Sequence, residues 1–291
     1  MSKMEKQKCY KYKLVIVSVT YKSNITELKE FINSFFRFND LGNEAKLIIV
    51  DNSPVDYRDV ELLINQYENV SYIPSPENPG FGSANNKGFD LYESEYALFI
   101  NNDVEFTEPL FQKLIKIHES DERIGCIGIH QTGGAPSFFK KFTAPKNIKN
   151  NLFQDKYHFI SGAFMFFKSS VFEKCGKFDP YMFMYLEEFD IATRLNTIGY
   201  TTCYVPDLNF FHKTFKRRQS FNELGWKYGA DSHFYICKKH EIDPHTGFYS
   251  INLRLRKLQI YYLIQFKITE AIKIQRILCY RYKLMHEYEK Q

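Results

Sequence analysis

The sequence has few cysteines, a single tryptophan and no apolar run long enough to cross a membrane. Its six cysteines are far apart, without a CxxC pair or a cysteine–histidine spacing that would bind zinc. The apolar run at residues 14–19 is too short for a signal peptide, and far shorter than the roughly 18–20 residues of a membrane span. We therefore expect a cytoplasmic protein with free thiols.

The motifs of two common kinds of nucleotide site are also missing. Residues 78–88 (NPGFGSANNKG) are rich in glycine, but they match neither the GxGxxG spacing of dinucleotide sites nor a P-loop.

The formal net charge of +5 is mild and spread along the chain, which argues against a nucleic-acid partner. Aromatic residues, by contrast, are abundant at 17% and provide for a large core and for surfaces on which ligand rings could stack.

Apolar, β-branched runs alternate with amphipathic stretches in the first part of the chain. Strands are expected at 14–19, 47–50, 70–73 and 96–100, and helices at 24–38, 60–67 and 83–92. This alternation is typical of βαβ units. It predicts an α/β fold with a mostly parallel, Rossmann-like central sheet and helices on both faces.

Polar residues follow each of these strands. They are Thr20, Tyr21, Asp51, Asn78, Asn101, Asn102 and Asp103. Parallel strands bring their carboxyl ends to one edge of the sheet, where ligands of such folds bind. One carboxylate beside amide oxygens suits a hard cation such as Mg²⁺, which substrate phosphates complete. Taken singly, residues 101–103 are better explained as an Asn/Asp turn, and Asp51 is equally well explained as part of an Asx-turn or as a helix cap.

A second acidic group, Glu187, Glu188 and Asp190, lies at the start of a predicted helix. Carboxylates are favoured there by the helix dipole, and Asp190 can pair with Arg194 one turn later. The functional interpretation is that one carboxylate acts as a general base in a partly apolar setting. The small residues around Gly162 either leave room for an acceptor or allow close packing.

The last part of the chain changes composition. Residues 251–282 form a basic amphipathic helical region, after a basic cluster at 213–218. We predict a domain at 1–240 and a helical extension at 241–291. The extension packs on its own domain, forms a homodimer through 245–285, or lies on the inner face of the cell membrane.

Six motifs in this order resemble the inverting family 2 glycosyltransferases, especially bacterial rhamnosyltransferase-like members. They are residues 17–21 (VSVTY), 50–53 (VDNS), 78–86 (NPGFGSANN), 100–104 (INNDV), 161–165 (SGAFM) and 178–190 (FDPYMFMYLEEFD). The match spans roughly residues 13–240. The resemblance implies a GT-A fold, a nucleotide-sugar donor and a divalent cation, Mg²⁺ or Mn²⁺.

The resemblance also assigns roles to particular residues. It implies a nucleotide site at Thr20, Tyr21, Asp51, Asn78, Lys87, Asn101 and Asn102. Asp103 and His212 would hold the metal, although Asn101 replaces the first acid of the family's metal motif. Glu188 would be the catalytic base, unless Glu187 takes that role. Gly162 and Asp190 would bind the acceptor or the sugar.

The predicted function is transfer of a sugar to a hydroxyl of a growing surface glycan such as a capsule or lipopolysaccharide. The resemblance points to rhamnose from dTDP-rhamnose, or else to galactofuranose, galactose or glucose from UDP. The acceptor is unidentified, and a lipid-linked glycan would suit the basic C-terminal region. The competing hypotheses are a non-catalytic nucleotide-sugar-binding subunit and a scaffold at the membrane surface.

Overall fold

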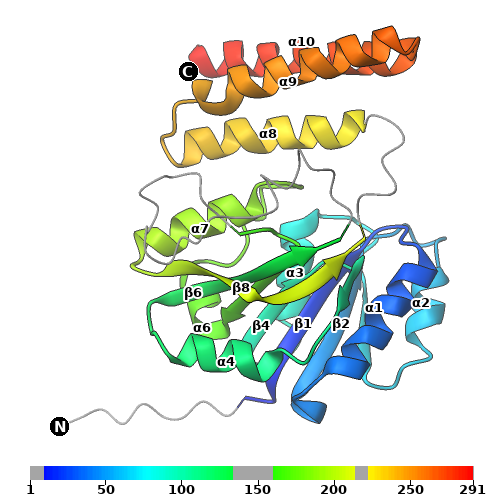
Figure 1. Ribbon diagram of the computed structural model, residues 1–291, viewed down its shortest axis with the longest axis vertical. Coiled ribbons are helices and arrows are strands. Elements are labelled where there is room, and N and C mark those ends of the chain that lie inside the picture. The colour runs from blue at the N-terminus through cyan, green and yellow to red at the C-terminus, as the bar shows by residue number, and fades with distance from the viewer. Residues whose placement is uncertain (1–9, 134–159, 214–221, 291) are drawn as a thin grey trace. The chain divides into compact units, whose positions relative to one another are not determined.

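The computed structural model describes residues 10–133, 160–213 and 222–290 (Figure 1). The chain divides into two compact units. The first is Met1–Pro180 with Glu187–Thr214, and the second is Tyr181–Leu186 with Phe215–Gln291. The described residues of the first unit contain the sheet, and those of the second unit contain three long helices.

The sheet has eight strands in the order β3-β2-β1-β4-β7-β6-β8-β5. The strands are β1 (Tyr12–Thr20), β2 (Ala45–Asp51), β3 (Val70–Pro74), β4 (Ser94–Ile100), β5 (Val104–Phe106), β6 (Ile124–Thr132), β7 (Phe164–Lys168) and β8 (Thr201–His212). Strands β3, β2, β1 and β4 are parallel, whereas β7 is antiparallel to both of its neighbours. At the far edge, β6 and β8 are parallel and β5 is antiparallel to β8. The predicted α/β fold is thus confirmed, with a parallel half and a mixed half.

Helices cover both faces of this sheet. They are α1 (Ile25–Phe38), α2 (Asp59–Ile64), α3 (Phe81–Phe89), α4 (Phe111–Glu119), α6 (Ser169–Lys174) and α7 (Glu187–Thr197), with a short 3₁₀ helix η1 (Gly42–Glu44). Side chains alternate along β1, so Leu14 and Ile16 enter one core and Val15 and Val17 enter the other.

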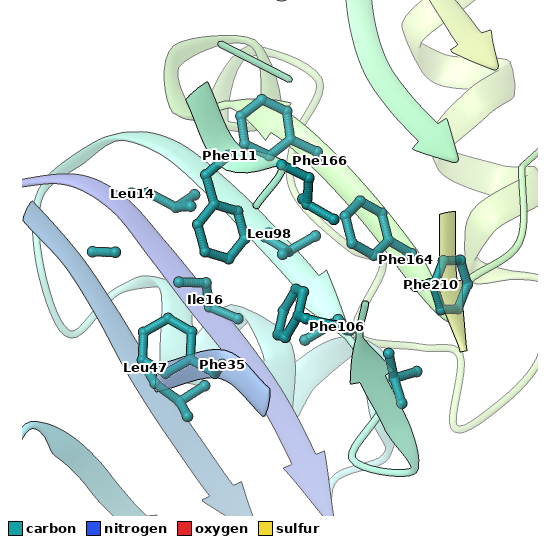
Figure 2. Packing of buried hydrophobic residues seen from close by; sticks show 14 of the residues in the cluster. Leu14, Ile16, Phe35, Leu47, Leu98, Phe106, Phe111, Phe164, Phe166 and Phe210 are labelled. Atoms are coloured by element: carbon teal, nitrogen blue, oxygen red, sulfur yellow. The ribbon is translucent and has the colours of Figure 1, made fainter. Parts of the chain in front are cut away.

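The first core contains Phe31 and Phe35 of α1 together with residues of α2 and α4. Figure 2 shows Phe35 and, from α4, Phe111 among the side chains of this core. The second contains residues of α3, α6 and α7. Helix α3 lies so close to β1 that a Cβ atom on Gly88 would be 2.5 Å from Val17 Cγ1. Because no side chain fits there, the glycine-rich segment is held directly against the strands whose ends carry the candidate site.

The second unit consists mainly of α8 (Glu223–Lys239), α9 (His245–Ile264) and α10 (Ile268–Glu289). Leu255 of α9 packs on Ile274, Ile277 and Leu278 of α10. Helix α8 also contacts α10, so the predicted boundary between 240 and 241 falls inside this unit rather than before it. In the described part of the chain, no helix is long and apolar enough to cross a membrane.

Candidate active site

The ends of β1 and β2 place Thr20 and Asp51 side by side. The two residues are register partners, and Thr20 Oγ1 donates a 2.8 Å hydrogen bond to Asp51 Oδ1. The same oxygen accepts bonds from Ser53 N at 3.1 Å and Ser53 Oγ at 2.6 Å. Both Thr20 and Asp51 are buried. The structure therefore brings these two predicted nucleotide-site residues together, inside a network that fixes the carboxylate.

Tyr72, which the sequence analysis did not single out, completes this network. Its hydroxyl donates to Asp51 Oδ2 at 3.2 Å, because β3 pairs with β2 at the same end. Burial, followed by the charge of Asp51, raises the pKa of Tyr72 to about 12. Tyr72 therefore remains a hydrogen-bond donor at neutral pH. The sequence could have indicated this role only through the place of Tyr72 on the strand that pairs with the one ending in Asp51. That pairing could not be recognised before the strand order was known.

Asp103 and His212 lie together at the far edge of the sheet. Strand β5 pairs with β8 so that Val104 is opposite His212, which leaves His212 Nε2 3.0 Å from Asp103 Oδ1. His212 is buried, and its Nδ1 has no hydrogen-bond partner within the described residues. The two predicted metal ligands are therefore adjacent although they are far apart in sequence.

This pair fits a divalent cation as a partial set of ligands. Neighbouring ligands of an octahedral ion with bonds of about 2.1 Å lie about 3 Å apart, close to the observed separation. The carboxylate suits a hard cation such as Mg²⁺ or Mn²⁺, and the imidazole adds a nitrogen ligand of the kind that transition-metal ions accept. Across the described ranges, no group of three His, Cys, Asp or Glu side chains could hold a metal. The remaining positions would fall to a donor's phosphates and to water.

The amides before Asp103 are held by hydrogen bonds. The backbone N–H of Asn101 donates to Ala163 O at 3.2 Å, which joins the end of β4 to the segment before β7. Asn102 Nδ2 donates to Ser23 Oγ, which links the same turn to the loop after β1. Both side chains are partly exposed. Their predicted place beside a nucleotide is therefore accessible.

The other predicted nucleotide residues differ in how tightly they are held. Tyr21 is exposed directly after β1. Asn78 has a φ of 45°, a left-handed conformation that asparagine adopts more readily than most residues. Lys87 is exposed and already bonded, with its Nζ 3.0 Å from Pro74 O and 3.1 Å from Glu77 Oε1. To contact a phosphate, Lys87 would have to leave Glu77.

Glu188 and Gly162 form the second predicted group. Glu188 is in the first turn of α7, and a Cβ atom on Gly162 would be only 3.4 Å from its Oε2. Burial of the carboxyl raises the pKa of Glu188 to about 7, although backbone hydrogen bonding acts in the opposite direction. Glu187 is buried. Glu188 is therefore a half-buried carboxyl poised near neutral pH beside a position without a side chain.

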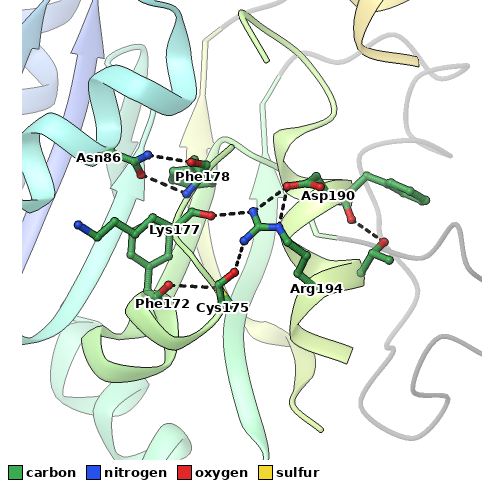
Figure 3. Close-up of polar contacts among 9 residues, drawn as sticks. Asn86, Phe172, Cys175, Lys177, Phe178, Asp190 and Arg194 are labelled. Carbon is green, nitrogen blue, oxygen red and sulfur yellow. Dashed lines mark hydrogen bonds and ion pairs between the residues drawn. The ribbon is translucent and has the colours of Figure 1, made fainter. Parts of the chain in front are cut away.

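Asp190, in contrast, has a structural role, which its position one helical turn before Arg194 had already suggested. Its side chain is 0% exposed, and Arg194 Nη2 and Nε lie 2.7 Å and 2.9 Å from its Oδ2 (Figure 3). Arg194 also donates to the carbonyl oxygens of Cys175 and Lys177. Asp190 thus anchors α7 to the turn after α6. Its carboxylate is enclosed, so the geometry does not support the predicted contact with acceptor or sugar.

Asn86 has a positioning role that the sequence analysis missed. Its Nδ2 donates to Phe178 O at 2.8 Å and its Oδ1 accepts from Phe178 N at 3.1 Å (Figure 3). This pair of bonds ties α3 to the segment that leads toward α7. A side-chain amide can satisfy both backbone atoms in this way, because it carries a donor and an acceptor side by side.

Comparison with known proteins identifies the family. Rhamnosyltransferase WbbL of Escherichia coli (strain K12) is 25% identical over 253 residues, which are 78% of this chain and 92% of the relative. An N-acetylglucosaminyl-diphospho-decaprenol L-rhamnosyltransferase of Mycobacterium tuberculosis (strain ATCC 25618 / H37Rv) is 23% identical over 68% of this chain and 75% of its own length.

Among solved structures, the mannosyltransferase PcManGT of Pyrobaculum calidifontis, in complex with GDP-Man and Mn²⁺, aligns with a TM-score of 0.59 and 14% identity. The alignment covers 81% of this chain and 68% of that protein, and it confirms the predicted GT-A fold. The family described as Glycosyl transferase family 2 matches residues 15–176, more than half of the chain. The protein is therefore a glycosyltransferase that belongs to glycosyl transferase family 2.

Proposed function

We propose that this glycosyltransferase transfers one sugar from a nucleoside-diphosphate donor to a glycan hydroxyl with inversion, and that Glu188 is its general base. The observation that carries the proposal is the position of the Glu188 carboxyl, next to Gly162 at the start of α7. Because burial raises the pKa of Glu188 to about 7, the carboxylate is basic enough to accept a proton near neutral pH.

The proposed reaction is a single displacement. Glu188 accepts the proton of the acceptor hydroxyl while that oxygen forms a bond to the anomeric carbon. The bond from the anomeric carbon to the diphosphate breaks, and the nucleoside diphosphate leaves with the electron pair. Attack from the face opposite the leaving group inverts the anomeric configuration. Glu188 then returns its proton to water.

A divalent cation would be held by Asp103 and His212. When bound, it would stabilise the negative charge that develops on the departing diphosphate. The solved mannosyltransferase contains Mn²⁺, a cation for which the Asp103 carboxylate is a suitable ligand. At the ends of β1, β2 and β3, the Thr20–Asp51–Tyr72 network would bind the base and ribose of the donor.

We infer that the donor sugar is rhamnose, supplied as dTDP-rhamnose. The support is that both curated relatives described above are rhamnosyltransferases. One of them is named for a lipid-diphosphate-linked acceptor, and a lipid-linked glycan is the acceptor that we propose here. Product formation from dTDP-rhamnose and the UDP-activated forms of galactofuranose, galactose and glucose would identify the donor. Faster turnover with a UDP-sugar would contradict the rhamnose assignment.

The rate of transfer should depend on pH through Glu188. A general base works only when deprotonated, so kcat/KM should fall about tenfold for each pH unit below about 7 and stay constant above it. An ordinary glutamate would show this fall only below about 4.3. The measurement is kcat/KM between pH 5 and 9 with a saturating divalent cation. A profile that stays flat down to pH 5 would contradict a base with a raised pKa, whereas the Glu188→Gln variant tests the identity of the base.

We also propose that the turn between α9 and α10 contacts the membrane that carries the acceptor. Ile264, Phe266 and Ile268 expose 72%, 89% and 52% of their surfaces there, beside Lys267. Burying two such side chains in lipid contributes about 3 kcal/mol or more. The variant Ile264→Ser/Phe266→Ser should therefore co-sediment with phosphatidylglycerol vesicles at least tenfold more weakly than the native chain.

Val55→Ser is the matched control for vesicle binding, because Val55 is 78% exposed in the first unit. It should bind vesicles like the native protein. Equal binding by all three proteins, or no binding by any, would reject membrane contact through this turn.

A further inference from the structure

The helical unit contains a cavity of about 270 Å³, and none of its described lining residues is among those assigned above to the donor, the metal or the general base. Gly225 and Gly229 lie one turn apart on α8 and both line it. Glycine weakens the interior of a helix, so two glycines on one face need a reason. At Gly229 a Cβ atom would meet only the ring of Tyr185, at 3.8 Å. At Gly225, in contrast, a Cβ atom would lie 2.7 Å from Asn222 Nδ2 and 2.9 Å from the Tyr185 hydroxyl oxygen, so that glycine permits a close approach. The missing side chain at Gly229 is the one that leaves open space.

Arg281 of α10 lines the cavity with a buried positive charge. The residue is 2% exposed, and its Nε donates to Asn252 Oδ1 at 2.6 Å. Its Nη2 has no hydrogen-bond partner among the described residues, and no described carboxylate pairs with the guanidinium. Burial lowers the pKa of Arg281 to about 10, which still leaves it protonated at neutral pH. The guanidinium also lies over the ring of Phe248, 5.2 Å from its centroid, but a ring supplies no negative charge. A buried cation without a paired carboxylate among the described residues favours an anionic ligand.

The other polar lining groups add a donor and no negative charge. Asn222 Oδ1 accepts from Gly225 N at 3.0 Å to cap α8, so its amide nitrogen remains as a donor. His233 Nε2 lies 3.2 Å from Pro244 O, and burial followed by the charge of Arg281 lowers the pKa of His233, so it is neutral. None of the described lining residues is Asp or Glu. The described lining thus carries one positive charge, with apolar walls that include Trp226 and Ile251.

Strained backbone forms another part of the wall. Tyr185 and Leu186 line the cavity with φ angles of 75° and 70°, which are rare for residues other than glycine. The segment is held to α8, since Ser232 Oγ donates to Met184 O at 2.9 Å. Strain of this kind persists where the surroundings fix it, and it is frequent at ligand clamps.

We propose that this cavity is a second ligand site, which binds a singly charged oxyanion, a carboxylate or a phosphodiester, carried on a small apolar or aromatic body. One guanidinium matches one negative charge, whereas a nucleoside diphosphate carries more charge than the lining balances. The apolar walls take the body of the ligand, as in most small-molecule sites. The lining residues that the structure describes all belong to the helical unit, and none of them is among those that we assign to the donor.

Calorimetry and thermal shift on the full-length protein test this proposal with two pairs of probes. Benzoate represents the carboxylates and diethyl phosphate the phosphodiesters, while benzamide and triethyl phosphate are their neutral counterparts. At least one anion should bind at least tenfold more tightly than its neutral counterpart and raise the melting temperature. The anion that binds more tightly shows whether the site takes a carboxylate or a phosphodiester. If neither anion binds, or if neither is preferred to its counterpart, the proposal is wrong.

Two substitutions at Gly229 locate the binding. Gly229→Leu should fill the cavity and abolish anion binding, without removing Arg281. Gly229→Ala adds one carbon in van der Waals contact with Tyr185 and should keep anion binding, with an equal or higher melting temperature for the free protein. Arg281→Met should bind anion and neutral probe equally if it folds. Anion binding by a folded Gly229→Leu protein that equals the native affinity would overturn the assignment to this cavity.

Discussion

Replacing Glu188 with glutamine should lower kcat by about 10²- to 10⁴-fold, the usual contribution of a positioned general base. Glutamine keeps nearly the same shape but cannot accept a proton from the acceptor hydroxyl at neutral pH. The side chain adjoins Gly162 rather than the Thr20–Asp51 network, so donor affinity should stay within about twofold. Release of the nucleoside diphosphate gives kcat, and calorimetry with the intact donor gives the affinity.

Glu187→Gln is the matched control, because it changes the neighbouring carboxylate in the same way. Glu187 is buried, so this substitution tests whether any loss of charge at the start of α7 is enough to stop transfer. We expect Glu187→Gln to retain substantially more activity than Glu188→Gln. If the ranking is reversed while both proteins bind donor, Glu187 is the base.

The strands at the centre of the sheet could be predicted from the sequence. The β-branched run at residues 14–19 corresponds to β1, and its abrupt polar end correctly predicted that Thr20 and Asp51 would share one edge. Such runs are informative because parallel strands are buried on both faces. Strand order beyond β4 has no comparable local signal, and the mixed half of the sheet was therefore not foreseen.

Long-range pairing explains the remaining differences. His212 reaches Asp103 only through the antiparallel pairing of β5 with β8, and family resemblance rather than spacing suggested that contact. Asp190 shows the opposite case. Its spacing of one helical turn from Arg194 correctly predicted an ion pair, whereas the resemblance had placed Asp190 in contact with the acceptor or the sugar. Local rules predict contacts within a helix, whereas contacts between distant strands depend on the whole topology.

Asp103→Ala should abolish the metal-dependent part of catalysis, with a loss of at least about 10³-fold in kcat/KM. Asp103 is the only carboxylate in residues 101–103, and Asn101 and Asn102 cannot replace its charge. The decisive measurement is the affinity for nucleoside diphosphate with and without Mn²⁺. The native protein should bind more tightly with Mn²⁺, and the variant should show no such difference, because the cation would no longer join the protein to the phosphates.

His212→Ala separates the contributions of the two ligands. It should weaken the response to Mn²⁺ but not remove it, because the carboxylate supplies the charge and the imidazole only a neutral lone pair. Asp207→Ala is the matched control, since Asp207 is an exposed aspartate on the same strand as His212 and should behave like the native protein. If Asp103→Ala kept the full response to Mn²⁺, the cation would have to bind elsewhere in the chain. The pair of residues at the edge of β5 and β8 would then be an ordinary hydrogen bond between histidine and aspartate.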